Sequence, residues 1–147
     1  MEKEYQDIFN EIQDTFGKSK LQPSQYSALA LAYIGDAVYD FIIRTIVIDL
    51  GAGHVKNFHR MTSSVVKAEA QAKLMKILED KLTEEEVAYY RRGRNAKSAT
   101  SAKNASIVDY RVATGFEALV GYWYLTHQME RAMKLLHDGM IEADKMP

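Results

Sequence analysis

A chain of 147 residues is long enough for one domain, and 47% hydrophobic with 27% charged residues is typical of globular proteins. The absence of cysteine excludes a disulfide framework and a thiolate metal site. A net charge of −1 excludes a global bias toward nucleic acid, so any such bias must be local. The first residues, MEKEYQDIF, lack the apolar core of a signal peptide, and we therefore expect a cytoplasmic protein.

Apolar residues at helical spacing predict a first, amphipathic helix that ends at Gly17. These residues are Tyr5, Ile8, Phe9, Ile12 and Phe16. We assign residues 1–20 to an N-terminal extension and residues 21–147 to one domain.

The stretch from Leu29 to Ile48, LALAYIGDAVYDFIIRTIVI, predicts a long buried helix, because a strand of this length would be abnormal. We expect it to begin near Pro23, which is acceptable in a first turn, and to end near Gly51. The polar stripe of Asp36, Asp40 and Arg44 interrupts the apolar run, so we expect no membrane span.

Further helices complete an all-α, single-domain bundle of six to seven helices, without strands. We predict a short helix over His54–Arg60, one capped by Ser63 or Ser64, one opened by a capping box at Thr83 to Glu86, one from Ser106 to about Leu125, and one from Met129 to Met140.

Two acidic residues stand in the most apolar helices. Asp36 is costly there unless it is paired or bound, and Glu117 borders the inward stripe of its own helix. If the two helices pack together, the carboxylates can meet, and both stay ionised only when a cation joins them. Oxygen ligands favour Mg²⁺ or Mn²⁺, which can promote an in-line displacement at phosphorus. The alternative is two unrelated buried acids, each satisfied by a hydroxyl, a tyrosine or Arg44.

One segment of the chain carries charged side chains of positive sign only. No Asp or Glu occurs between Val87 and Val108, and the expected loop over Gly93–Asn104 is small and polar. Such a loop suits phosphate and ribose contacts, although a solvated turn is the simpler interpretation. The candidate RNA-binding residues are Arg91, Arg92, Arg94, Asn95, Lys97, Ser98, Lys103 and Asn104.

Three motifs together resemble a known family. LALAYIGDAVYDF (Leu29 to Phe41), RRGRNAKSATSAKN (Arg91 to Asn104) and GFEALVGYWYL (Gly115 to Leu125) occur in the order found in the ribonuclease III catalytic domain. The chain from about Tyr26 to His137 is most similar to the short bacterial Mini-III branch of that family.

The resemblance implies a homodimeric, Mg²⁺-dependent endonuclease that cuts double-stranded RNA and leaves 5′-phosphate and 3′-hydroxyl ends. It places the metal-binding, catalytic acids on Asp36 and Glu117, and it implies precursor 23S ribosomal RNA as substrate. We expect the apolar surface around Tyr33 and Ile34 to serve the dimer interface.

The chain also departs from the larger enzymes of the family. Leu29, Ala32 and Thr114 stand where those enzymes carry further acids, which leaves two side-chain carboxylates and puts the number of metal ions in doubt. No double-stranded RNA-binding domain is expected, so the basic loop must supply many of the contacts to the RNA. A non-catalytic helical RNA-binding or ribosome-assembly module is the competing hypothesis, and a helical scaffold without an RNA partner is a third.

Overall fold

The computed structural model describes residues 8–18, 20–50, 54–96 and 106–144. Within these ranges the chain forms seven α-helices and two 3-10 turns and contains no strand, which confirms the predicted all-α bundle. The elements are α1 (Ile8–Phe16), η1 (Pro23–Gln25), α2 (Ala28–Asp49), α3 (Val55–Val66), α4 (Ala68–Leu78), η2 (Glu79–Lys81), α5 (Glu84–Arg94), α6 (Ile107–Leu125) and α7 (Met129–Ala143).

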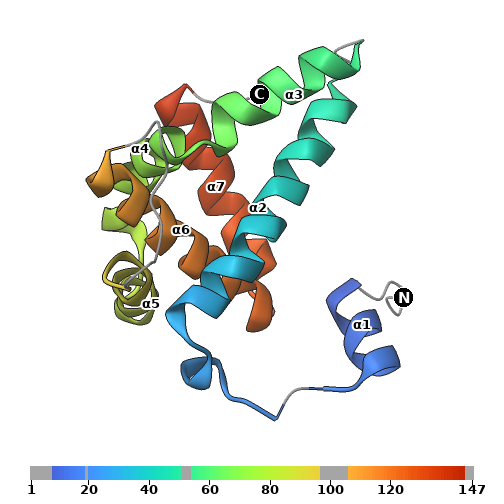
Figure 1. Ribbon diagram of the computed structural model, residues 1–147, viewed down its shortest axis with the longest axis vertical. Coiled ribbons are helices and arrows are strands. Elements are labelled where there is room, and N and C mark those ends of the chain that lie inside the picture. Colours follow the sequence, from blue (N-terminus) through green and yellow to red (C-terminus); the bar gives the residue numbers. More distant parts are fainter. Residues whose placement is uncertain (1–7, 19, 51–53, 97–105, 145–147) are drawn as a thin grey trace.

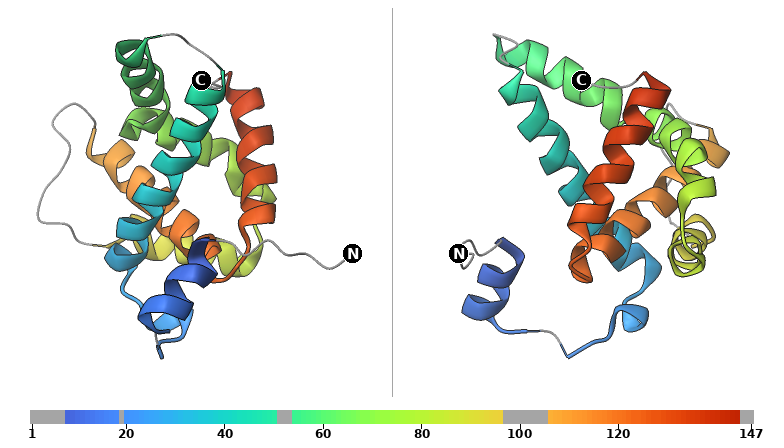
Figure 2. Two further views of the ribbon diagram at one scale, coloured as in Figure 1. Left: turned by 90° about the vertical axis from the view of Figure 1, so that its right-hand side faces the viewer. Right: turned by 180° about the vertical axis from the view of Figure 1, so that it is seen from behind.

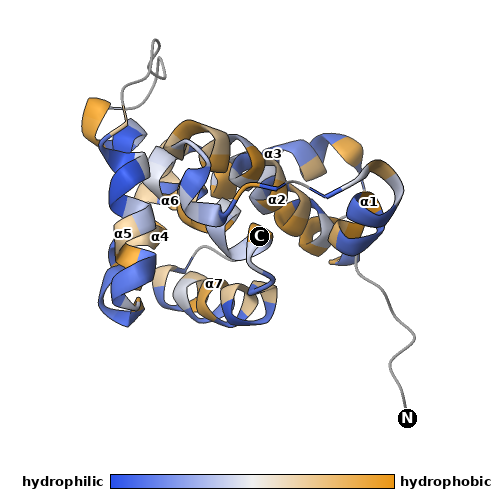
Figure 3. Cartoon of the chain, turned by 90° about the horizontal axis from the view of Figure 1, so that it is seen from below, coloured by the Kyte–Doolittle hydropathy of each residue, from blue (hydrophilic) through white to orange (hydrophobic). Residues whose placement is uncertain are grey.

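Helix α6 is the centre of the bundle. It packs against α2, α4, α5 and α7, and α2 crosses it as the longest helix of the described chain (Figure 1). Phe116, Leu119 and Trp123 of α6 are fully buried, and so are residues on its other sides. A helix that is covered all round needs no polar face, which explains why α6 is so apolar (Figure 3). Helix α2 is buried along one side only and keeps apolar residues such as Tyr33 and Phe41 exposed.

Helices α2 and α6 cross at two glycines. A Cβ atom on Gly35 would overlap the carbonyl oxygen of Glu117 and lie 2.8 Å from the amide nitrogen of Gly121. A Cβ atom on Gly121 would in turn overlap the carbonyl oxygen of Leu31. Because side chains at the contact set how closely helices approach, only glycine permits this crossing. The crossing also brings the carboxyl group of Asp36, the residue after Gly35, close to that of Glu117.

The predicted start of α2 is wrong. The helix begins at Ala28, and the Ser27 hydroxyl accepts a hydrogen bond from the amide of Ala30 at 3.0 Å. Pro23 instead opens the separate turn η1. Serine caps a helix better than the preceding residues can, because its oxygen satisfies an amide that has no partner within the helix.

The boundary between the next two helices is also different from the prediction. Ser63 and Ser64 lie inside α3, and the hydroxyl of Ser64 donates to the carbonyl of Met61 at 2.8 Å instead of capping a new helix. The break falls at Lys67, whose backbone is extended (φ −66°, ψ 155°) and which ends α3 and begins α4. A single extended residue therefore makes the α3–α4 corner.

Three other predicted helix ends are confirmed. Gly17 follows α1 with φ +100°, a conformation that favours glycine. Thr83 and Glu86 form the capping box, and Ser106 caps α6 by accepting from the amide of Asp109 at 3.0 Å. Residues 51–53 and 97–105, which include Gly51 and most of the predicted basic loop, lie outside the described residues.

Glu86 has a second role that joins three helices. Its carboxylate is 2% exposed and accepts hydrogen bonds from Nε1 of Trp123 at 2.7 Å and from Arg131 at 2.6 and 2.7 Å. Burial would raise the pKa of Glu86, but the hydrogen bonds from Arg131, Trp123 and Thr83 outweigh it and lower the pKa to about 2. The ion pair with Arg131 thus ties α5 to α7, and the hydrogen bond from Trp123 ties α5 to α6.

Helix α1 stands apart from the bundle (Figure 2). The Phe9 side chain of α1 contacts the bundle. The centroid of its ring lies 4.9 Å from that of the Tyr124 ring and 4.6 Å from that of the His127 ring. Among the described residues, no helix is long and apolar enough to cross a membrane.

Candidate active site

The structure brings the two predicted acids together at the α2–α6 crossing. Asp36 is exposed at the surface, whereas Glu117 is partly buried between α2, α4 and α6. Their carboxyl groups are close enough to interact as hydrogen-bonding partners. The alternative of two unrelated acids is therefore excluded, and Arg44 pairs with Asp40 instead, at 2.6 Å.

The environment of Glu117 opposes its negative charge. Burial and, after it, the neighbouring Asp36 raise the pKa of Glu117 to about 8, while a hydrogen bond from Gln71 acts in the opposite direction. The pair therefore holds a proton at neutral pH unless a cation replaces it. A raised carboxyl pKa with a specific charge partner is typical of a functional site.

The donor set fits a hard divalent cation. Two carboxylates, one of them open to solvent, offer oxygen ligands and leave room for water, as Mg²⁺ requires. No group of three or more acidic, histidine or cysteine side chains is placed to hold a metal in the part of the chain that the structure describes. Thr114, which stands at the position of a further acid in the larger enzymes, donates its hydroxyl to the carbonyl of Tyr110 at 3.0 Å.

The predicted RNA-binding residues fall into two groups. Lys97, Ser98, Lys103 and Asn104 lie outside the described residues. Arg91 is exposed at the end of α5, and Arg94 lies over the ring of Tyr90 and donates to Asn95 at 3.3 Å. Arg92 is engaged inside the protein, because it donates to the carbonyl of Tyr26 at 2.6 Å and lies over the ring of Tyr89.

Sequence reasoning missed Gln71, which touches the acidic pair. Its side-chain amide donates to Oε2 of Glu117 at 3.2 Å, and the residue is 2% exposed. A signal was present, because Gln71 precedes Leu74, Met75 and Leu78 at helical spacing and so belongs to the inward face of α4.

Comparisons with known proteins identify the family of the chain. The model of the ribonuclease III domain matches residues 29–128. Mini-ribonuclease 3 of Enterococcus faecalis is 51% identical over 115 residues, which cover 77% of this chain and 87% of the relative. Mini-ribonuclease 3 of Clostridium tetani is 47% identical over 124 residues, 84% of this chain and 81% of the relative.

A solved structure of a protein from Fusobacterium nucleatum has the same fold. It superimposes with a TM-score of 0.74 at 27% sequence identity, over 82% of this chain and 95% of the other.

The helical bundle is a ribonuclease III domain, and the chain belongs to the ribonuclease III family. It is an endoribonuclease of double-stranded RNA, and proteins of this family use a divalent metal ion. Within the family it belongs to the Mini-ribonuclease 3 branch.

Proposed function

We propose that the protein is a homodimeric, Mg²⁺-dependent ribonuclease that cuts precursor 23S ribosomal RNA and leaves 5′-phosphate ends. The observation that carries this proposal is the contact between Asp36 and Glu117 at the α2–α6 crossing. This substrate would place the protein in the cytoplasm. Mn²⁺ would be able to support cleavage in place of Mg²⁺, because both ions prefer oxygen ligands.

Asp36 and Glu117 would hold the ion. When bound, the ion supplies a water activated for attack and charge stabilisation at phosphorus. Asp36 is exposed and faces incoming RNA, while Glu117 is half-buried and anchored by Gln71. The division into residues 1–20 and 21–147 stays a prediction, and the family match begins at Leu29.

Cleavage of a labelled precursor of 23S ribosomal RNA, with and without Mg²⁺, tests the proposal. We expect two cuts, one in each strand of a duplex, that require the metal and map to the same positions as the processed ends in cells. Retention of the RNA without cleavage would favour the non-catalytic binding module. An absence of salt-sensitive RNA retention would favour the helical scaffold.

The metal-free protein is expected to lose stability as the pH rises. The pKa of Glu117 is raised from 4.5 to about 8, so the contribution of this group to stability is fully present below about pH 4.5 and is lost as the pH rises through 8. The loss is on the order of 2 kcal/mol after solvent screening, or roughly 5 °C in Tm. Thermal unfolding in EDTA between pH 5 and 9 measures it.

A Glu117→Gln variant is the control for this pH dependence. It cannot ionise at that position, so its Tm should fall less over the same pH interval. Mg²⁺ should stabilise the parent most at high pH. Parallel curves for the two proteins would contradict the assignment of the buried proton to Glu117.

The basic end of α5 is proposed to contact the RNA backbone, together with Lys97, Ser98, Lys103 and Asn104. Arg91→Ala should raise KM and lower the slope of log affinity against log salt by about 1 for the lost phosphate contact. Arg92→Ala should instead lower Tm, because it removes the bond to the Tyr26 carbonyl. Lys134→Ala on α7 is the charge-matched control. If Arg91→Ala and Lys134→Ala show the same dependence of affinity on salt, Arg91 does not contact the RNA.

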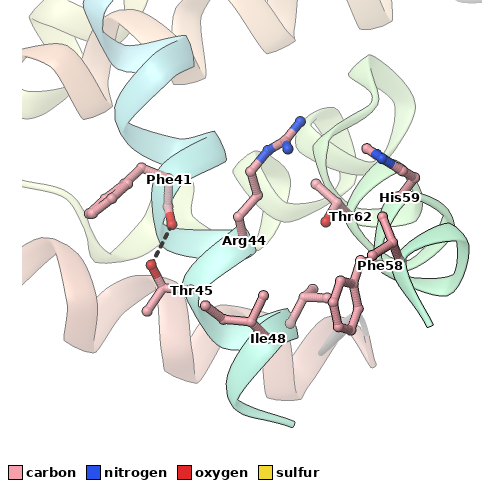
Figure 4. A pocket seen from close by; sticks show the side chains of 9 residues that line it. Phe41, Arg44, Thr45, Ile48, Phe58, His59 and Thr62 are labelled. Atoms are coloured by element: carbon pink, nitrogen blue, oxygen red, sulfur yellow. Dashed lines mark hydrogen bonds between the residues drawn. The ribbon is translucent and has the colours of Figure 1, made fainter. Parts of the chain in front are cut away.

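The homodimer is proposed to form through the outer face of α2. Tyr33, Phe41 and Ile48 follow one another along this face and are 83%, 65% and 58% exposed. Beside Phe41 and Ile48, a pocket of about 290 Å³ lies between α2 and α3 and is bordered by Phe58 and His59 (Figure 4). Asp36 and Glu117 do not line this pocket, so we assign it to the dimer surface and not to the active site.

Two-fold symmetry suits this substrate, because a duplex has two antiparallel strands and a symmetric dimer has two equivalent sites. Phe41→Glu places a charge in the proposed interface and should convert the dimer to a monomer in light scattering. Phe16→Glu is the matched control, because Phe16 is 82% exposed but lies on α1. A Phe41→Glu protein that keeps the mass of the parent dimer would exclude this face as the interface.

A further inference from the structure

Gln71 stands between the acidic pair and the α3–α4 corner. Its Nε2 donates to the carbonyl of Val66 at 2.8 Å and to Oε2 of Glu117 at 3.2 Å. We propose that Gln71 is a positioning residue that fixes the carboxylate of Glu117 for metal binding. The inference rests on the proposed metal site and names a residue outside the two ligands.

The orientation of the Gln71 amide is determined by its neighbours. Both groups near Nε2, the Val66 carbonyl and the Glu117 carboxylate, are acceptors, so only the NH₂ end can face them. A flipped amide would turn its oxygen toward two other oxygens. The side chain therefore has one orientation, with a donor on Glu117.

The backbone anchors this donor. Val66 is the last residue of α3, so its carbonyl belongs to the group that has no partner within the helix. Gln71 satisfies that carbonyl from the first turns of α4 and extends the same NH₂ to α6. As a result, the hydrogen bond engages Oε2 of Glu117 and not Oε1.

Stability does not explain a glutamine at this place. Oε1 of Gln71 is buried and has no hydrogen-bond partner among the described residues, and burying an unpaired amide oxygen costs free energy that an apolar side chain would not lose. A lysine would compete with the metal ion for Glu117, and an acid would add a third negative charge. A neutral donor orients the carboxylate without either effect.

Gln71→Met tests the inference, because methionine has a similar shape and no donor. We expect Mn²⁺, titrated into the dimeric protein without RNA and followed by calorimetry, to bind roughly 10- to 100-fold more weakly, as found for other residues that orient metal ligands. The Mg²⁺ concentration that half-saturates cleavage should rise by the same factor, while Tm in EDTA stays close to that of the parent.

Leu74→Met is the matched control. Leu74 is 2% exposed on the same helix, but it packs toward Gly139 of α7, away from the acidic pair. Its Mn²⁺ affinity should equal that of the parent. Equal affinities for the parent, Gln71→Met and Leu74→Met would overturn the positioning role while leaving the proposed metal site intact, whereas a parent that binds no Mn²⁺ would refute the metal site itself.

A measurement on the unmodified protein decides the question if Gln71→Met fails to fold. The two side-chain amide protons of Gln71 should exchange slowly with solvent and shift in NMR spectra when Mg²⁺ saturates the site, because their acceptor changes its charge environment. Gln71 amide signals that exchange freely or stay unchanged on saturation would contradict the inference.

Discussion

An Asp36→Asn variant should remain folded and cleave double-stranded RNA at least about a thousandfold more slowly than the parent. An amide cannot balance the charge of a dication, and a loss of several kcal/mol of metal-dependent stabilisation corresponds to this factor. Asp36 is exposed, so the change leaves no cavity, and it removes a negative charge beside Glu117. The Tm in EDTA should therefore equal or exceed that of the parent. Single-turnover cleavage at saturating RNA measures the effect.

Asp49→Asn is the control for this variant. Asp49 is the last residue of α2 and is exposed, so the same chemical change is made on the same helix away from the crossing. The control should cleave at the parental rate. Near-parental cleavage by Asp36→Asn would show that the site is not at this acidic pair, and equal losses in both variants would indicate a non-specific charge effect.

Gly35→Ala should lose both stability and activity, because the added methyl group would overlap the carbonyl oxygen of Glu117. Helix α2 must move away from α6, and such overpacking costs roughly 3 kcal/mol or more at a contact between two backbones. The same movement separates Asp36 from Glu117. We expect a lower urea midpoint, and weaker Mn²⁺ binding at temperatures where the variant is folded.

Gly139→Ala on α7 separates this effect from the general consequences of replacing a helical glycine. Its added Cβ would meet the ends of the Leu74 and Leu78 side chains, at 2.8 and 2.9 Å, and these can move. Alanine also favours the helix by about 1 kcal/mol, which offsets part of that cost. A Gly35→Ala protein as stable and active as Gly139→Ala would show that the crossing tolerates a wider separation.

The residues alone left open whether Asp36 and Glu117 meet or are unrelated buried acids, and the resemblance to the ribonuclease III catalytic domain favoured their meeting. The closeness of the helix crossing could not be predicted. Glycine is required at position 35 because the backbone of Glu117 lies against it, and this contact exists only in the packed bundle. The same holds for Gln71. Its inward position was visible in the pattern of α4, but its two acceptors come from α3 and α6.

Capping motifs in the sequence predicted a helix end correctly where one motif was present. They predicted it wrongly where two serines were both candidate caps. Thr83 and Glu86 cap α5 as their spacing predicts. Ser63 and Ser64 resemble caps equally well, yet α3 continues through them and stops at Lys67. Arg92 shows the same limit for charge patterns, because its place in a basic segment did not reveal that it binds the Tyr26 carbonyl.

The placement of the two acids on helices distant in sequence has a consequence during protein synthesis. The ribosome produces α2 well before α6, and chains grow at about 5–20 residues per second. A nascent chain that ends before Glu117 contains Asp36 but lacks the second carboxylate of the proposed metal site. If that site carries the activity, we expect the growing polypeptide not to cleave the RNA of the ribosome that makes it until α6 has emerged and packed against α2.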